Sequence, residues 1–217
     1  LPINSGVFCL KKDRFQDVVW IGTDGQGVYL YSNPLYSIKS MVLSNYTEKI
    51  ERPVRAIYLD DERTFWVGTK GNGILKIYDY EFDKNISDCR AEVLTTSNSA
   101  LSSNAVYCFA KSHRNLLWIG DEEGLTYYSY REKRIKSIPI RIGNEDFKYI
   151  HDIYETADSE LWLASVGMGV VKARIAGTPD NPVIVDAQRY VINDGELGSN
   201  YFFTIYAENE ANLLFGN

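Results

Sequence analysis

Two short acidic runs contain residues that could perform chemistry. Asp60-Asp61-Glu62 and Asp121-Glu122-Glu123 each place carboxylates side by side, and hydrolysis of a glycosidic bond requires a pair of carboxylates. Acidic runs are equally typical of exposed turns between strands, because Asp favours turn conformations. We therefore expect exposed hairpin turns at both places, and a lyase or a glycosidase remains the alternative.

The two histidines are the second place where chemistry could occur. His113 lies in a polar turn, and His151 lies beside Asp152 in an apolar stretch. A ligand-binding or catalytic role for His151 is one hypothesis, but no neighbouring residue has the spacing of a metal-ligand set. We expect a structural histidine, and the sequence predicts no catalytic residue, no metal site and no cofactor.

Cysteine usage and charge narrow the function further. Cys9, Cys89 and Cys108 have no C-x-x-C spacing, which disfavours a zinc or redox site. We expect Cys9 and Cys108 to be small buried residues, since free Cys is commonly buried. The net charge of −6 disfavours nucleic acid and anionic membrane surfaces as partners of this chain.

One short motif recurs along the chain and must position all of these residues. It is an apolar strand with Trp followed two residues later by Gly, as in Leu117-Trp118-Ile119-Gly120, with Ala164 in place of Gly in the fourth copy and Leu214 in place of Trp in the fifth. The recurring position is occupied by Trp20, Trp66, Trp118, Trp162 and Leu214. Successive copies are therefore 46, 52, 44 and 52 residues apart. Self-similarity at a period of roughly 40–50 residues predicts a propeller or a solenoid.

The content of each repeat favours the propeller. Each repeat reads as about four short strands with no helical pattern, whereas solenoid β-repeats are shorter, at roughly 20–30 residues. Gly after the Trp strand predicts close approach of the next sheet or a bulge. We therefore predict an all-β fold, a partial β-propeller over 1–217 with about four and a half four-stranded blades. The predicted blade cores are 7–43, 54–95, 105–138, 149–191 and an incomplete 201–217.

The repeat resembles a known family, the propeller repeat of two-component regulators. The resemblance is carried by the Leu-Trp-Ile-Gly strand and the following Gly-x-Gly turn, as in Gly25-Gln26-Gly27. It is also carried by two lead-in segments, Leu101-Ser102-Ser103-Asn104 and Leu197-Gly198-Ser199-Asn200. The resemblance covers essentially the whole chain.

The resemblance implies a sensing function. Proteins with such repeats are typically hybrid two-component system histidine kinases, with periplasmic propellers, an immunoglobulin-like domain, a transmembrane helix and a kinase. It implies a periplasmic, non-enzymatic module of a larger protein that responds to an oligosaccharide from polysaccharide breakdown. A propeller enzyme and a protein-interaction scaffold of the WD40 kind remain alternatives. WD40 repeats carry Gly-His and Trp-Asp signatures, which this sequence does not contain.

Candidate ligand-binding residues follow from propeller geometry. Loops that lead into the inner strands and loops between the second and third strands gather on one face. Aromatic and hydrogen-bonding side chains there would suit a sugar. The candidates are Arg52, Arg55, Lys70, Asn104, Asp121, Tyr149, Asn200 and Tyr201.

The expected partners are of three kinds. The first is an oligosaccharide, and the second comprises the remaining propeller blades and the immunoglobulin-like domain of the same protein. The third is a second copy of the chain, because an open fragment exposes sheet faces that favour self-association.

Overall fold

The computed structural model describes residues 3–32, 37–41, 52–80, 89–195, 197–209 and 212–217. The chain divides into two compact units, which are described separately: Leu1–Asn98 with Asn104–Val106, and Ser99–Ser103 with Tyr107–Asn217. Within the described ranges, no helix has the length and apolar character needed to cross a membrane.

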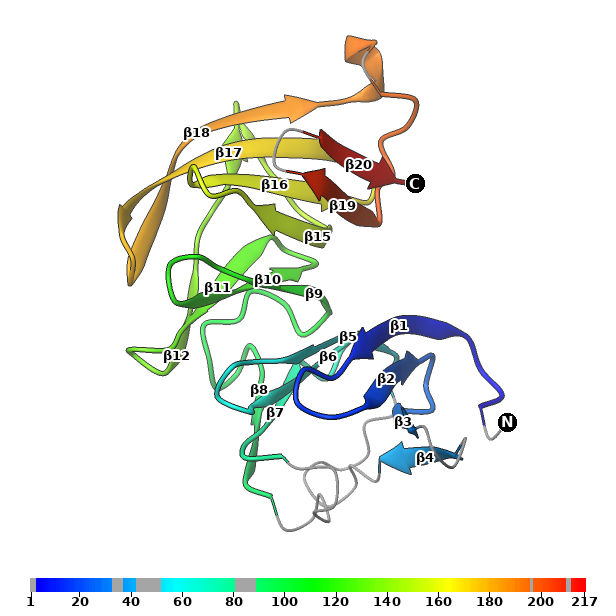
Figure 1. The fold of residues 1–217 in the computed structure, drawn as a ribbon. Helices are drawn as coiled ribbons and strands as arrows, with labels where there is room; N and C mark the ends of the chain where they lie inside the picture. The colour runs from blue at the N-terminus through cyan, green and yellow to red at the C-terminus, as the bar shows by residue number, and fades with distance from the viewer. Residues whose placement is uncertain (1–2, 33–36, 42–51, 81–88, 196, 210–211) are drawn as a thin grey trace. The chain divides into compact units, whose positions relative to one another are not determined.

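The first unit contains two four-stranded antiparallel sheets, each in chain order (Figure 1). One sheet consists of β1 (Val7–Lys12), β2 (Val18–Thr23), β3 (Val28–Ser32) and β4 (Ser37–Met41). The other consists of β5 (Val54–Leu59), β6 (Phe65–Thr69), β7 (Ile74–Ile77) and β8 (Ala91–Leu94). The predicted blade core 7–43 therefore has its fourth strand, β4, while residues 33–36 and 42–43 of that core lie outside the described residues.

The second unit contains two further four-stranded sheets of the same order. They are β9 (Val106–Lys111), β10 (Leu116–Asp121), β11 (Leu125–Ser129) and β12 (Arg134–Ser137), then β15 (Ile150–Glu155), β16 (Glu160–Ser165), β17 (Gly169–Thr178) and β18 (Asn181–Tyr190). A short hairpin, β13 (Arg141–Ile142) with β14 (Glu145–Asp146), lies between them in the chain. A 3-10 turn, η2 (Ile192–Asp194), precedes the two-stranded sheet of β19 (Thr204–Asn209) and β20 (Asn212–Gly216).

Tryptophan on the second strand packs between successive sheets, as the repeat predicts. Trp20, Trp66 and Trp118 are fully buried. The ring of Trp20 lies 4.6 Å from the ring of Phe65 on the next sheet, centroid to centroid. Trp118 belongs to a core cluster with Leu163 and other residues of the following sheet. Burying an aromatic removes roughly 150–250 Å² from water, so these side chains dominate the packing between sheets.

Buried carboxylates satisfy the indole nitrogens. Trp20 Nε1 donates to Asp13 Oδ2 at 2.9 Å, and Trp66 Nε1 donates to Asp60 Oδ2 at the same distance. In both repeats the acceptor comes from the turn just before the Trp strand. Trp118 differs, because its Nε1 donates at 2.7 Å to Glu155, which lies on the next sheet. The same indole requirement is thus met within one repeat or across two repeats.

Glycine after the Trp permits the close approach predicted from the sequence. A Cβ on Gly120 would lie 2.5 Å from Cys108 Sγ and 2.7 Å from the carbonyl oxygen of Ile150, which belongs to the next sheet. A Cβ on Gly22 would similarly lie 2.5 Å from Cys9 Sγ. Any larger residue would push these sheets apart.

These features define the fold. Within each unit, short antiparallel sheets that follow one another in the chain pack through the Trp strand of one sheet on the inner strand of the next, as the blades of a β-propeller do. The predicted all-β propeller is confirmed.

Candidate ligand-binding site

The first acidic run is a turn, but its leading carboxylate is buried. Asp60 is 1% exposed. Its Oδ1 accepts hydrogen bonds from the amides of Glu62 and Thr64, at 2.9 and 2.8 Å, and its Oδ2 accepts from Trp66. The expectation of a fully exposed turn is wrong for Asp60, because the run closes the turn and satisfies the buried indole at once. This carboxylate therefore faces no substrate.

The second acidic run is built in a similar way. Asp121, a predicted ligand-binding residue, is fully buried at the end of β10. Its oxygens accept from Ser102 Oγ at 2.6 Å and from the amides of Glu123 and Gly124, at 2.9 and 3.0 Å. Burial raises the pKa of Asp121 above its usual value. Its oxygens support the turn, while its neighbour Glu123 is half exposed.

Asn104 and Asn200 hold turns of the preceding repeat. The carbonyl oxygen of Asn104 accepts from the amides of Gly71 and Gly73, both at 2.9 Å. Its side-chain oxygen accepts from the amide of Thr96 at 2.9 Å. Asn200 repeats the arrangement, with amides of the turn at 167–169 on its carbonyl and the amide of Ile192 on its side chain. The side-chain oxygens of both candidates are therefore engaged in structural contacts.

Tyr149 and Tyr201 are brought together on the same turn of the second unit. The amide of Val166 donates to the carbonyl oxygen of Tyr149 at 3.2 Å, and Val166 forms an antiparallel bridge with Tyr201. The side chains are exposed, at 42% for Tyr149 and 58% for Tyr201. Two exposed aromatic residues are therefore joined through the backbone of Val166, and each can offer a ring face for stacking.

The backbone of Tyr149 is strained. Its φ is +55°, in the left-handed region that bulky residues rarely occupy. Hydrogen bonds fix this conformation on both sides, since its amide donates to the carbonyl oxygen of Glu122 at 3.0 Å and its carbonyl accepts from Val166. Strain of this kind clusters at functional sites, and Tyr149 is the one residue among the eight sequence candidates whose φ lies in this region.

Inner-strand bulges carry a second row of side chains. The register shifts between Val7 and Cys9, between Val54 and Ala56, and between Ile150 and Asp152. The extra residues are Phe8, Arg55 and His151, and a bulge turns the extra side chain away from its normal face.

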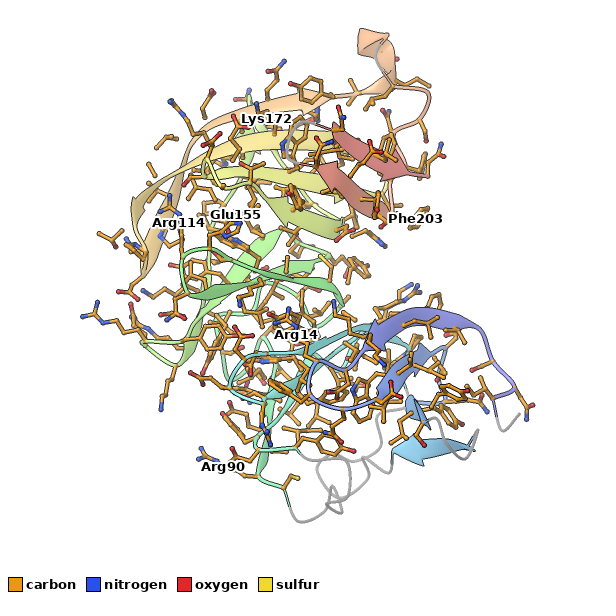
Figure 2. All side chains as sticks on the ribbon, viewed as in Figure 1. Arg14, Arg90, Arg114, Glu155, Lys172 and Phe203 are labelled. Atoms are coloured by element: carbon orange, nitrogen blue, oxygen red, sulfur yellow. The ribbon has the colours of Figure 1, made fainter. Side chains whose placement is uncertain are left out.

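The bulge residues meet aromatic neighbours. In the first unit, the guanidinium of Arg55 lies 3.6 Å from the ring centroid of Phe8, and its buried Nε has no hydrogen-bond partner among the described residues. In the second unit, His151 stacks on Tyr107 at 4.2 Å and meets Phe203 edge-on at 5.4 Å. Figure 2 labels Phe203, which precedes β19 and is 54% exposed. His151 thus belongs to an aromatic row.

Arg52 and Lys70 lie together on the equivalent turn of the first unit. Both are exposed. The amide of Lys70 donates to Pro53, the residue after Arg52, at 2.9 Å, and Lys70 forms an antiparallel bridge with Ala105. The structure therefore assembles Arg52, Lys70 and Asn104 in the first unit, and Tyr149, Asn200 and Tyr201 in the second.

A pocket of about 470 Å³ lies in the second unit, beside Tyr149 in the chain. The residues that line it are Ser102, Glu123, Gly124, Leu125, Ser137, Ile138, Pro139, Ile140, Arg141, Asp146, Phe147 and Lys148. Sequence reasoning missed this pocket, because the β13–β14 hairpin that forms one wall lies outside the repeated motif. The sequence signal that could have pointed to the pocket is the group of charged residues Arg141, Glu145, Asp146 and Lys148.

Comparison with solved structures identifies the class of protein as a β-propeller. The β-propeller domain of Cps50 (Swd1) from Myceliophteria thermophila is 13% identical, with a TM-score of 0.56, over 86% of this chain and 61% of that one. PorZ, a surface component of the type-IX secretion system of Porphyromonas gingivalis, is 15% identical, with a TM-score of 0.65, over 92% of this chain and 29% of that one. No family model matches the chain.

A more particular likeness follows. The extracellular domain of a protein described as a hybrid two-component system of B. thetaiotaomicron is 15% identical, with a TM-score of 0.53, over 99% of this chain and 41% of that one. The resemblance to two-component-regulator propellers is thus confirmed at the level of the fold. Translation initiation factor 6 of Saccharolobus solfataricus is 31% identical over 140 residues. That match covers 58% of this chain and 57% of the factor, so the chain spans little more than half of this curated relative.

Proposed function

We propose that this chain is a periplasmic, ligand-sensing part of a hybrid two-component sensor histidine kinase, and that its ligand is an oligosaccharide released from a polysaccharide. The recurring Trp-strand motif and the likeness to an extracellular domain of a hybrid two-component system support the sensor class. The chain spans 41% of that solved domain, so the kinase and its output belong to the proposal.

The exposed pair Tyr149 and Tyr201 is the observation that carries the ligand class. Sugars present C–H faces that stack on aromatic rings and hydroxyls that need polar partners. Two exposed tyrosines at one turn, one of them on a strained backbone, provide both a ring face and a phenol hydroxyl. An aromatic pair kept at the surface and fixed by hydrogen bonds suits a recognition site.

The geometry supports recognition over hydrolysis. A glycosidase needs two carboxylates that reach the substrate, roughly 5–9.5 Å apart. Asp60 and Asp121 are buried, and their oxygens accept hydrogen bonds from turn amides. The exposed carboxylates Glu123 and Asp146 are each held in an ion pair, with Lys148 and Arg141 respectively. His151 lies in an aromatic stack, which favours a packing or binding role for this ring.

Binding to a glycan array followed by titration calorimetry tests the ligand class. We expect the Tyr149→Ala and Tyr201→Ala variants each to weaken binding of a positive glycan at least tenfold, because each removes a stacking face. Tyr206→Ala is the matched control, since Tyr206 is 63% exposed on β19. Absence of binding to every glycan, or an equal loss in the control, would contradict the proposal.

The proposed partners within the protein and between copies are tested separately. A transmembrane helix and a kinase domain in the same reading frame would support the sensor, and a stop codon directly after the chain would contradict it.

Apolar side chains are exposed on β1 and β20, with Leu10 at 64% and Leu214 at 59%. We expect Leu10→Glu or Leu214→Glu to reduce self-association in light scattering; a monomeric parent at high concentration would remove that part of the proposal.

A further inference from the structure

The pocket of the second unit has an apolar floor. Its lining includes Leu125, Ile138, Ile140 and Phe147, whose exposed fractions are all 5% or less. The volume of about 470 Å³ falls within the range of roughly 300–1,000 Å³ that is usual for ligand sites. The pocket therefore has room for about one or two sugar rings, and its apolar side chains present only a small surface to them.

The rim of the pocket carries four charges in two ion pairs. Lys148 Nζ lies 2.5 Å from Glu123 Oε2, and Arg141 Nε lies 2.8 Å from Asp146 Oδ1. Arg141 and Asp146 are cross-strand partners in the β13–β14 hairpin, so the hairpin holds their pair in place. The side chains are a third to nearly three quarters exposed, from 35% for Lys148 to 71% for Arg141.

The pairing of these charges determines which ligand the rim favours. Two cations and two carboxylates cancel, so a charged ligand is attracted by one member of each pair and repelled by the other. The net charge of −6 on the chain further disfavours an anion. A hydroxyl both donates and accepts, so it can donate to Glu123 and accept from Lys148 together. Exposed ion pairs contribute little to stability, so sharing their donors with a ligand costs little.

The pocket also adjoins the exposed tyrosine site through the chain. Lys148 on its rim immediately precedes Tyr149, and the amide of Tyr149 is bonded to Glu122, next to Glu123.

We infer that this pocket binds a neutral, polyhydroxylated sugar unit, and that it selects neutral over acidic oligosaccharides. The inference rests on the proposed sensing function and specifies the chemical class of its ligand. The Lys148–Glu123 and Arg141–Asp146 pairs are the specificity-determining groups.

Calorimetric titration of the full chain with defined sugars tests this inference. The neutral probes are maltotriose, cellotriose, mannotriose and galactobiose, and the acidic probe is digalacturonic acid. We expect at least one neutral probe to bind and digalacturonic acid to bind at least tenfold more weakly. Lys148→Met and Glu123→Gln should each weaken the neutral probe about tenfold. Arg131→Met is the control, because Arg131 forms an exposed ion pair with Asp180 in the same unit, away from the pocket lining.

The outcomes separate this inference from the proposed function. Loss of neutral-sugar binding in Lys148→Met and Glu123→Gln, with Arg131→Met unchanged, supports the pocket. If a sugar binds and only the Tyr149→Ala and Tyr201→Ala variants lose it, the pocket inference is wrong while the sensing proposal stands. Tighter binding of digalacturonic acid overturns the neutral selectivity. Glu123 is half exposed, so Glu123→Gln reports on binding even if another variant fails to fold.

Discussion

Replacement of Asp60 tests the account of how each Trp strand is held. Asp60→Ala removes the acceptor of three hydrogen bonds, from Glu62, Thr64 and Trp66, at 2.8–2.9 Å. The indole is fully buried, so loss of the acceptor for its N–H costs about 1–3 kcal/mol. The amide of Thr64 lies in a residue only 3% exposed, and its loss adds about 1 kcal/mol. We expect a total loss near 3 kcal/mol in the free energy of unfolding.

Asp60→Asn separates the hydrogen bonds donated by the turn amides from the hydrogen bond donated by the indole. An amide side chain offers one acceptor oxygen, so it can keep the turn amides or the indole but not both. We expect Asp60→Asn to cost about 1–2 kcal/mol, and less in a Trp66→Phe background, where no indole N–H needs a partner. The coupling in the double-mutant cycle should be about 1 kcal/mol.

Urea unfolding followed by circular dichroism measures all four proteins of this cycle. Ser112→Ala is the comparison in the third repeat, because Ser112 stands at the turn position that Asp60 occupies, while Trp118 is bonded to Glu155 instead. It should cost less than Asp60→Ala. A coupling near zero, or equal losses for Asp60→Ala and Ser112→Ala, would refute the argument that the carboxylate acts through the indole.

Three further predictions follow from the described packing. Gly120→Ala should cost about 1–3 kcal/mol in urea unfolding, because its Cβ would lie 2.5 Å from Cys108 Sγ and 2.7 Å from the carbonyl oxygen of Ile150; an unchanged midpoint would contradict the close approach of the sheets. Burial raises the pKa of Asp121, so the folded state keeps its proton to higher pH than the unfolded chain, and this contribution to stability is lost as pH rises from about 4. Asp121→Asn should therefore gain in unfolding free energy relative to the parent between pH 4 and pH 7, and a constant difference would show the sign to be wrong. Cys108 is buried as expected, whereas Cys9 is only partly buried. Desolvation raises the pKa of Cys9 to about 11 and that of Cys108 well above its ordinary value, so at pH 8 only about one Cys9 in a thousand is thiolate. Mass spectrometry should show iodoacetamide labelling of both at least tenfold slower than in urea, and equal rates would contradict the raised pKa values.

The sequence predicted the fold because the strongest constraints recur in register. Trp20, Trp66 and Trp118 must be buried wherever sheets pack through them, and a Gly must follow where the next sheet approaches. These requirements are local to each repeat, so residue spacing alone reveals them. The odd repeat, with Leu214 in place of Trp, still forms the β19–β20 sheet.

The sequence could not predict contacts that join different repeats. Trp118 and Glu155 are 37 positions apart, and the turn before Trp118 offers a Ser where the second repeat has Asp60. Arg114 also approaches Glu155, with its Nε 3.8 Å from Oε1, and Figure 2 shows the two side chains close together. Such pairs depend on three-dimensional register between sheets, which spacing within a repeat does not contain.

The candidate site was predicted in part. Tyr149 and Tyr201 were named from their place before inner strands, and the structure brings them to one turn. Asn104 and Asn200 occupy the same lead-in position, but their oxygens are bonded to backbone amides. An isolated sequence does not distinguish an Asn that binds a ligand from one that binds a neighbouring turn, because both need the same hydrogen-bonding group at a loop.

The junction made by Asn104 and Asn200 has an evolutionary consequence. In each junction, the carbonyl oxygen of one Asn accepts hydrogen bonds from the main-chain amides of two Gly residues. These hydrogen bonds do not depend on the side chains around them. Duplication of a gene segment that encodes one blade could therefore preserve this backbone joint, whereas the contacts of Trp118 with Glu155 and of Gly120 with Ile150 would have to be matched again. Exposed loop residues such as Tyr149 are free to diversify, while the backbone joint stays the same.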